Sequence, residues 1–174
     1  MKAVLISIRP RWCERIASGR KTVEVRKTRL KIETPFKCYI YETKTRSDMP
    51  TFIGEDGHVL YTGRGQVIGE FVCDKISTFF DAKDACLSNE EIEKYAGGKT
   101  LYGWHISDLK IYDKPKKLSE FYVCKDDVED YCSGCVHHEC NEAEYPCCEC
   151  IKDERNRAYL YRPPQSWCYV EENV

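Results

Sequence analysis

Residues 17–27 read ASGRKTVEVRK, and they carry more information about the chain than any other stretch of this length. Gly19 is placed to end a helix in a left-handed conformation, which delivers Arg20 and Lys21 at the helix end. Residues 22–26 then alternate in polarity, as a half-buried strand does. The stretch therefore predicts a helix, a tight turn and a strand in quick succession.

The predicted strand places three polar side chains on one face, because successive residues of a strand point to opposite sides. These are Thr22, Glu24 and Arg26. Charges on the inward face of a barrel strand are costly unless they pair or meet a ligand. Taken alone, the residues favour the opposite arrangement, with the charges on the wet face of an edge strand and Val23 and Val25 inward.

Apolar, β-branched or alternating segments on both sides predict further strands. They are residues 3–8, 37–43, 66–76, 101–112 and 166–171, the last of which would close a barrel. Gly69 indicates a bulge or a close approach of other backbone, and Pro115 is placed to end the strand before it. Residues 45–65 are polar and Gly-rich, which is typical of a hairpin or a mobile loop.

Two short helices are expected between these strands. Pro10 suits the first turn of one of them, whose apolar face holds four residues. These are Trp12, Cys13, Ile16 and Ala17. Residues 88–91 (SNEE) form a capping box for the other, which runs through Tyr95 and ends at Gly97 and Gly98. Short strands with two or three short helices predict an α+β fold, a small mixed β-barrel forming a single domain over residues 1–174.

Six of the twelve cysteines crowd into a polar stretch, and residues 124–155 are interpreted as a Cys-rich insertion within the domain. Two CxxC pairs separated by eleven residues can place four thiolates around one tetrahedral zinc ion. The preferred ligands are Cys132, Cys135, Cys147 and Cys150, although Cys140, Cys148, His137 and His138 are close enough to substitute. Four thiolates leave no open coordination position, so we expect a structural zinc knuckle near the C-terminus. Buried free thiols are the alternative, but this polar run has little in which to bury them.

Charge and hydropathy indicate the class of partner. Residues 1–46 hold 13 Lys and Arg against 4 Asp and Glu, whereas the remainder holds 14 against 25. A basic half of this kind can attract a polyanion, or it can fold against the acidic half. The apolar run at the N-terminus is too short for a signal peptide, and no later stretch approaches membrane-spanning length. We therefore expect a cytoplasmic protein without a membrane partner.

The pattern Gly19-x-Lys21-x-x-Glu24-x-Arg26 resembles the GxKxxExR signature of ASCH domains, which are relatives of the PUA fold. The resemblance extends through ISIRPRWCERIASGRKTVEVRK, KCYIYETK, QVIGEFVCDKI, LYGWHISDLKIYDKPKKL and RPPQSWCYVEE. These segments stand in the order found in bacterial and phage proteins of that family. The resemblance implies a PUA-like barrel that binds RNA, and in some members hydrolysis of acylated cytidines or of RNA.

The preferred function is binding of RNA, or of a nucleotide-like small molecule, in a charged cleft around this motif. The residues expected to bind the ligand are Arg20, Lys21, Thr22, Glu24, Arg26 and Trp104. Cationic groups hold phosphates, a carboxylate accepts hydrogen bonds from a base edge, and an indole stacks on an unpaired base. Core packing is expected instead for Trp12, while Trp167 is left open.

Two other functions remain open. In a hydrolase, Lys21 and Glu24 would be the catalytic residues, with Glu70 or His105 as the nearest candidates for a third group. The family's amidohydrolases carry a threonine, which looks like their nucleophile, where this chain has Glu24, and this puts nucleophilic acyl transfer in doubt. In a protein-interaction module, the zinc knuckle would be the docking surface for a partner that the sequence does not identify.

Overall fold

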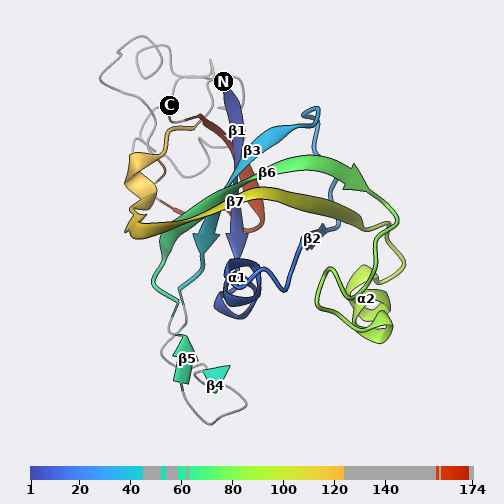
Figure 1. Ribbon diagram of the computed structural model, residues 1–174. Helices are drawn as coiled ribbons and strands as arrows, with labels where there is room; N and C mark the ends of the chain where they lie inside the picture. The colour runs from blue at the N-terminus through green and yellow to red at the C-terminus, as the bar shows by residue number, and fades with distance from the viewer. Residues whose placement is uncertain (45–51, 54–58, 62, 124–159, 161, 173–174) are drawn as a thin grey trace, which may run out of the picture.

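The computed structural model describes residues 1–44, 52–53, 59–61, 63–123, 160 and 162–172. In this part of the chain six strands form one curled sheet in the order β2-β7-β6-β3-β1-β8 (Figure 1). The strands are β1 (Lys2–Ile8), β2 (Val23–Arg26), β3 (Phe36–Glu42), β6 (Gln66–Ser77), β7 (Tyr102–Lys116) and β8 (Trp167–Glu171). β1 and β3 run parallel, and all other neighbours are antiparallel.

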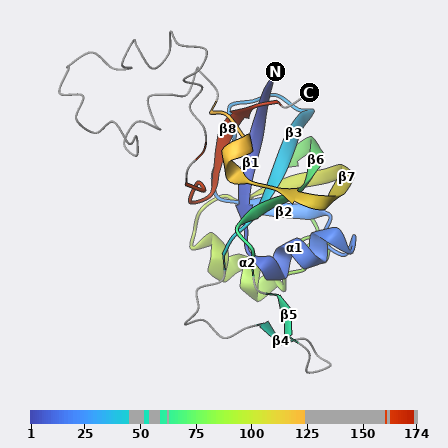
Figure 2. The same cartoon turned by 90° about the vertical axis from the view of Figure 1, so that its left-hand side faces the viewer.

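The remaining described elements are short. They are α1 (Pro10–Ala17), α2 (Asn89–Ala96), the 3-10 helix η1 (Leu118–Glu120), and the strands β4 (Phe52–Ile53) and β5 (Val59–Tyr61). β4 and β5 pair with each other, which agrees with the hairpin expected within residues 45–65. Figure 2 shows both α-helices at the end of the sheet opposite the N-terminus. The small α+β barrel expected from the sequence is thus present as a curled sheet with short helices.

The first strand and helix form as their residues predict. The apolar run of β1 is buried between β3 and β8, and α1 begins at Pro10. Gly19 adopts a left-handed φ of +72° just beyond the helix. Cys13 and Ile16 are the buried residues of α1. Ala17 is exposed, so its expected place on the apolar face was wrong.

β6 and β7 form the long antiparallel pair of the sheet, and their pairing carries several register shifts. At Gly69 an added Cβ atom would lie 2.5 Å from the carbonyl oxygen of Lys110, which confirms the close approach of backbone predicted there. The expectation that Pro115 ends β7 was wrong, since the strand runs on to Lys116. β2 pairs with β7 only from Tyr102 to His105, so β7 has β6 as its single neighbouring strand at Pro115, and an edge position of this kind tolerates proline.

α2 begins with the capping box predicted at Ser88 and ends at Gly97 in a left-handed conformation. α2 and the segment that precedes α2 in the chain together cover the outer face of β2. The residues of this small apolar cluster are Val23, Val25, Ala85 and Leu101, with Phe80, Leu87, Ile92 and Ala96 packed against them. The outer face of β2 is therefore dry, although β2 is an edge strand.

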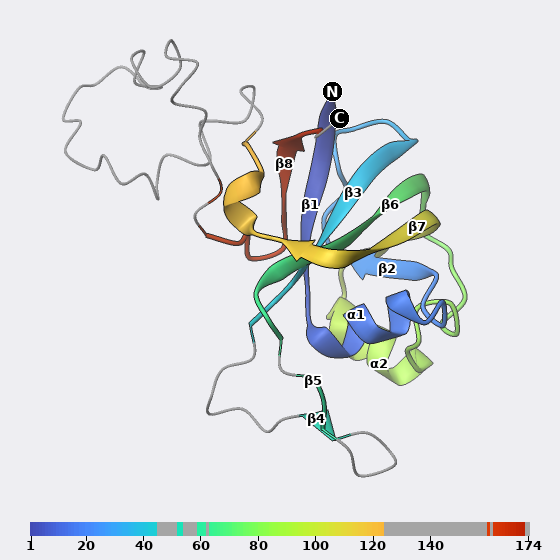
Figure 3. The same ribbon diagram turned by 60° about the vertical axis from the view of Figure 1, so that its left-hand side comes forward.

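β2 and β8 are the two edges of the curled sheet, which can be followed in Figure 3, and no backbone ladder joins them in the described residues. β8 pairs with β1 and makes an isolated bridge to Val123 on its other side. The expected closure of the barrel by this last strand is thus incomplete. Arg26 of β2 spans the gap, because its guanidinium donates to the Ser166 hydroxyl and to the Ser7 carbonyl.

The Cys-rich segment 124–155 and its four predicted zinc ligands lie outside the described residues, as does most of the 45–65 loop. None of the helices in the described part has the length and apolar character needed to cross a membrane.

Candidate functional site

The side chains of β2 divide between the interior of the curled sheet and its α2-covered outer face. Glu24 lies opposite Trp104 of β7, so the two side chains share one face of the sheet. Trp104 belongs to the main core cluster inside the curl. Glu24 is accordingly directed inward and is 6% exposed, while Val23 and Val25 pack under α2.

This arrangement corrects the interpretation that the charges of β2 lie on a wet outer face. The sequence pattern alone could not reveal it, because the element that covers the valines, α2, follows more than sixty residues later. Because the charges point inward, the cost of removing them from water must be offset by opposite charges or hydrogen bonds within the site.

That compensation comes from two cations on either side of Glu24. Lys21 Nζ lies 3.3 Å from Glu24 Oε2, and Arg26 Nη2 lies 3.0 Å from Glu24 Oε1. Lys21, 4% exposed, also donates to the Ala85 carbonyl at 2.9 Å. Arg26 donates to the Ser7 carbonyl at 2.8 Å and to Ser166 Oγ at 3.1 Å. The motif residues Lys21, Glu24 and Arg26 thus form one buried ion-pair network.

The half-buried indole of Trp12 lies beside this network. Lys21 Nζ is 5.1 Å from the centre of its ring, and the guanidinium carbons of Arg11 and Arg15 are 4.8 and 5.2 Å from it. Cations near an indole ring are attracted by its negative face. Trp12 packs against the core as expected, but it also forms part of a basic rim at the site.

The structure adds a carboxylate that was not among the residues predicted from the sequence. Glu42, the last residue of β3, is 2% exposed. Its Oε2 accepts a hydrogen bond from the Arg64 backbone N–H at 3.0 Å. The signal was present in the alternation of Cys38, Ile40 and Glu42, which places all three on the interior face of β3.

Cys13 lies among these charged groups. Burial raises the pKa of its thiol, the negative charges of Glu42 and Glu24 raise the pKa further, and the positive charge of Arg26 lowers it in part. A buried thiol of this kind is neutral and a poor nucleophile. The Cys13 thiol donates to the Ile8 carbonyl, and Ile8 lies opposite Glu42, so Cys13 lies near the end of β3 that carries Glu42.

Three buried polar atoms in this region have no hydrogen-bond partner among the described residues. They are Arg26 Nε, Trp104 Nε1 and Glu42 Oε1. Buried polar atoms are normally paired, so unpaired ones mark a place where a ligand or water completes the structure. We call these three atoms, with Lys21 and Glu24, the interior polar site.

Trp104 contributes to this site differently from the stacking role predicted for it. Its side chain is fully buried, with its ring centre 6.1 Å from that of Phe36 and 6.4 Å from that of Trp167. The indole is 0% exposed, so neither of its faces is open to a base in the structure. Its Nε1–H is the group that it can offer to a ligand.

The other predicted residues lie outside the interior polar site. Arg20 is exposed, pairs with Glu14 and donates to Ser18 Oγ, and Thr22 is also exposed. Glu70 lies opposite Tyr39, on the other face of the sheet, and accepts a hydrogen bond from Tyr112. His105 lies opposite Val23 and contacts Ser77. Neither Glu70 nor His105 therefore adds a third group to Lys21 and Glu24.

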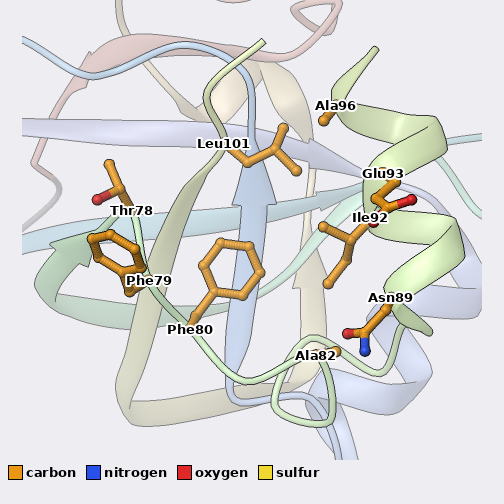
Figure 4. Close-up of a pocket in the computed structure, with 9 residues that line it drawn as sticks. All are labelled: Thr78, Phe79, Phe80, Ala82, Asn89, Ile92, Glu93, Ala96 and Leu101. Carbon is orange, nitrogen blue, oxygen red and sulfur yellow. The ribbon is translucent and has the colours of Figure 1, made fainter. Parts of the chain in front are cut away.

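A shallow pocket of about 380 Å³ lies beside α2 and contains none of the predicted site residues (Figure 4). Phe80, Ile92 and Leu101 form its apolar floor, and the exposed Phe79 stands at its edge. Within the described residues, no group of three or more His, Cys, Asp or Glu side chains could hold a metal ion.

No protein-family model and no curated protein sequence matches the chain. Its structure is similar to the crystal structure of an ASCH protein from Zymomonas mobilis, with a TM-score of 0.56 and 18% identity over 98% of this chain and 88% of that one. A tyrosine-to-phenylalanine mutant of the same protein gives a TM-score of 0.56 and 18% identity over 99% and 92% of the two chains. A serine-to-alanine mutant of it gives a TM-score of 0.54 and 18% identity over 98% of this chain and 89% of that one. The chain therefore has the fold of an ASCH domain.

Proposed function

We propose that this chain is an ASCH-family protein that binds single-stranded RNA, or a nucleotide-like ligand, with one base in the interior polar site. The observation that carries the proposal is the buried carboxylate of Glu24 between Lys21 and Arg26, next to polar atoms that lack partners among the described residues. A fold gains nothing in stability from burying such groups in place of apolar ones. A ligand that completes their hydrogen bonds accounts for them.

The charge balance of the site favours a base over a phosphate as the inserted group. Lys21 and Arg26 are matched by Glu24 and Glu42, so these four side chains supply as many carboxylates as cations. A phosphate would meet two carboxylates there, whereas a neutral base edge can use donors and acceptors alike.

The phosphates of the same ligand would lie outside, along α1 and the segment after β2. Arg9, Arg20, Lys27 and Arg29 are exposed there, and Arg11 and Arg15 approach Trp12. Cations of this kind bind the RNA backbone without reading its sequence. Trp12, at the boundary between interior and rim, is the aromatic side chain placed to stack on a base.

The site residues support binding better than hydrolysis. Both oxygens of Glu24 are held in ion pairs, so its role is to fix the two cations. A structural zinc ion bound by Cys132, Cys135, Cys147 and Cys150 remains part of the proposal and is supported by the spacing of these cysteines.

Fluorescence anisotropy with a fluorescein-labelled single-stranded RNA of mixed sequence tests the proposed function. We expect binding that weakens as salt rises from about 50 to about 200 mM, as it does where phosphates are contacted. Trp12→Leu should weaken binding about 5- to 150-fold, which corresponds to the loss of one stacked base. Lys99→Ala, at an exposed lysine beyond α2, is the matched control and should bind as the wild type does.

The same samples on a denaturing gel separate binding from cleavage. Intact RNA supports a binding protein, whereas shortened RNA that depends on Lys21 would replace it with a ribonuclease. Competition with mononucleotides separates an RNA site from a nucleotide site. Absence of binding to both RNA and mononucleotides at the lower salt concentration would overturn the proposed function.

A further inference from the structure

Glu42 is the least compensated charged group around the interior polar site. Glu24 meets two cations, but no ion pair to Glu42 is found in the described residues. The backbone N–H of Arg64 holds its Oε2, and its Oε1 is buried without a partner in that part of the chain. One oxygen is thus fixed in place while the other is left as a free acceptor.

A purely structural role explains only half of this geometry. Holding the Arg64 N–H requires one acceptor oxygen, which a glutamine would supply without a buried charge. The second oxygen adds a desolvated acceptor that nothing in the described structure uses. Its value to the protein must come from a hydrogen-bond donor that enters the site.

The atoms around Glu42 limit what that donor can belong to. Arg26 Nε and Trp104 Nε1 are both buried donors without partners among the described residues, and Glu42 Oε1 is a buried acceptor without one. Arg26 donates to the carbonyl of Ser7, and Glu42 lies opposite Ile8, the next residue of β1. Trp104 lies opposite Glu24, the ion-pair partner of Arg26. A ligand that satisfies all three atoms offers one donor and two acceptors.

We propose that Glu42 is a specificity-determining residue, which accepts a hydrogen bond from the Watson–Crick edge of a pyrimidine base. This inference rests on the proposed function. Uracil offers N3–H between the acceptors O4 and O2, and cytosine offers its amino group beside the acceptors N3 and O2. Adenine offers a single acceptor on this edge, and guanine offers two donors, so each purine leaves one of the protein atoms unpaired.

Anisotropy titrations with labelled ten-nucleotide oligo(U), oligo(C) and oligo(A) test this inference. We expect the wild type to bind oligo(U) and oligo(C) about 10-fold or more tightly than oligo(A), the range that one well-formed base contact gives. Glu42→Gln keeps an acceptor for the Arg64 N–H and presents an amide donor in place of the free oxygen. It should abolish the preference by weakening oligo(U) and oligo(C) binding, with oligo(A) binding unchanged.

Trp104→Phe removes the Nε1–H while keeping an aromatic ring, and should reduce the pyrimidine preference in the same direction. If Glu42→Gln shows no cooperative thermal unfolding, that variant has not folded, and the base preference of Trp104→Phe then tests the inference. Equal binding of all three oligonucleotides, or a preference that survives both variants, would overturn the inference and leave the proposed function standing. Absence of binding to all three by the wild type would overturn both.

Discussion

Substitution of Glu24 by glutamine provides a direct test of the buried ion-pair network. The change keeps the size of the side chain and removes its charge, which leaves Lys21 and Arg26 without their shared carboxylate. The side chains of Lys21 and Glu24 are 4% and 8% exposed, so water cannot replace the lost partner. Removal of one partner from a buried pair costs about 3–5 kcal/mol of stability. For a domain of this size, that lowers the melting temperature by about 6–20 °C.

Urea denaturation followed by far-UV circular dichroism measures this loss, and the chain offers a matched control. Glu14→Gln removes a carboxylate that pairs with the exposed Arg20, and such a surface pair contributes about 1 kcal/mol or less. The double variant Lys21→Met/Glu24→Gln should be less destabilised than the sum of its two single variants, because it no longer contains the unpaired lysine.

The result that would refute the reasoning is a small effect of Glu24→Gln. If it costs no more than Glu14→Gln, and if the Lys21 and Glu24 substitutions are additive, then Glu24 lies in water. The interior polar site would not exist in the form described.

Three further predictions concern the fold and the metal. The free energy of unfolding should fall above about pH 9. Burial raises the pKa of three thiols in the folded protein, so these thiols ionise there only in the unfolded chain. Urea titrations should show a loss of about 1.4 kcal/mol per pH unit for each thiol. The thiols are Cys13, Cys38 and Cys73, the last with a pKa of about 12. Cys38→Ala should lose less over the same interval, and an equal loss would contradict this. Gly69→Ala should cost about 1–3 kcal/mol, because its Cβ would meet the Lys110 carbonyl, and an unchanged urea midpoint would contradict that contact. Metal analysis of the purified chain should find roughly one zinc ion, lost with the Cys135→Ser substitution; zinc content unchanged by it would contradict the predicted ligand set.

The features that sequence could predict are those set by neighbouring residues. The capping box at Ser88 and the left-handed Gly19 involve only a few consecutive positions, and both are found where expected. The close backbone approach at Gly69 could be predicted because a glycine within a strand pattern often marks a place where another backbone comes near.

The features that sequence could not predict depend on distant segments. Whether Glu24 faces water or the interior is decided by α2, which covers the valines of the same strand. Pro115 lies in a part of β7 that has β6 as its single neighbouring strand, which is a property of the sheet order. The closure of the curl by Arg26 joins residues 140 positions apart in the chain.

Glu42 lies between these two cases. Its alternation with Cys38 and Ile40 indicated an inward side chain. The sequence could not show that the Arg64 backbone binds one of its oxygens and that the other is buried without a partner in the described residues. Candidate sites formed by one motif are therefore easier to find than the partners that complete them.

The central claim, that a base enters beside Trp104 and Trp12, is tested most directly by the indole N–H signals of the three tryptophans in nitrogen-15 NMR. The signals can be assigned with Trp12→Leu and Trp104→Phe, and short single-stranded oligo(U) is then added to the wild type. The account predicts that the Trp104 Nε1–H signal shifts strongly, as a group that gains its first hydrogen-bond partner, and that the Trp12 signal moves with it. Unchanged Trp104 and Trp12 signals under conditions where anisotropy shows bound RNA would contradict the account and place the RNA elsewhere on the protein.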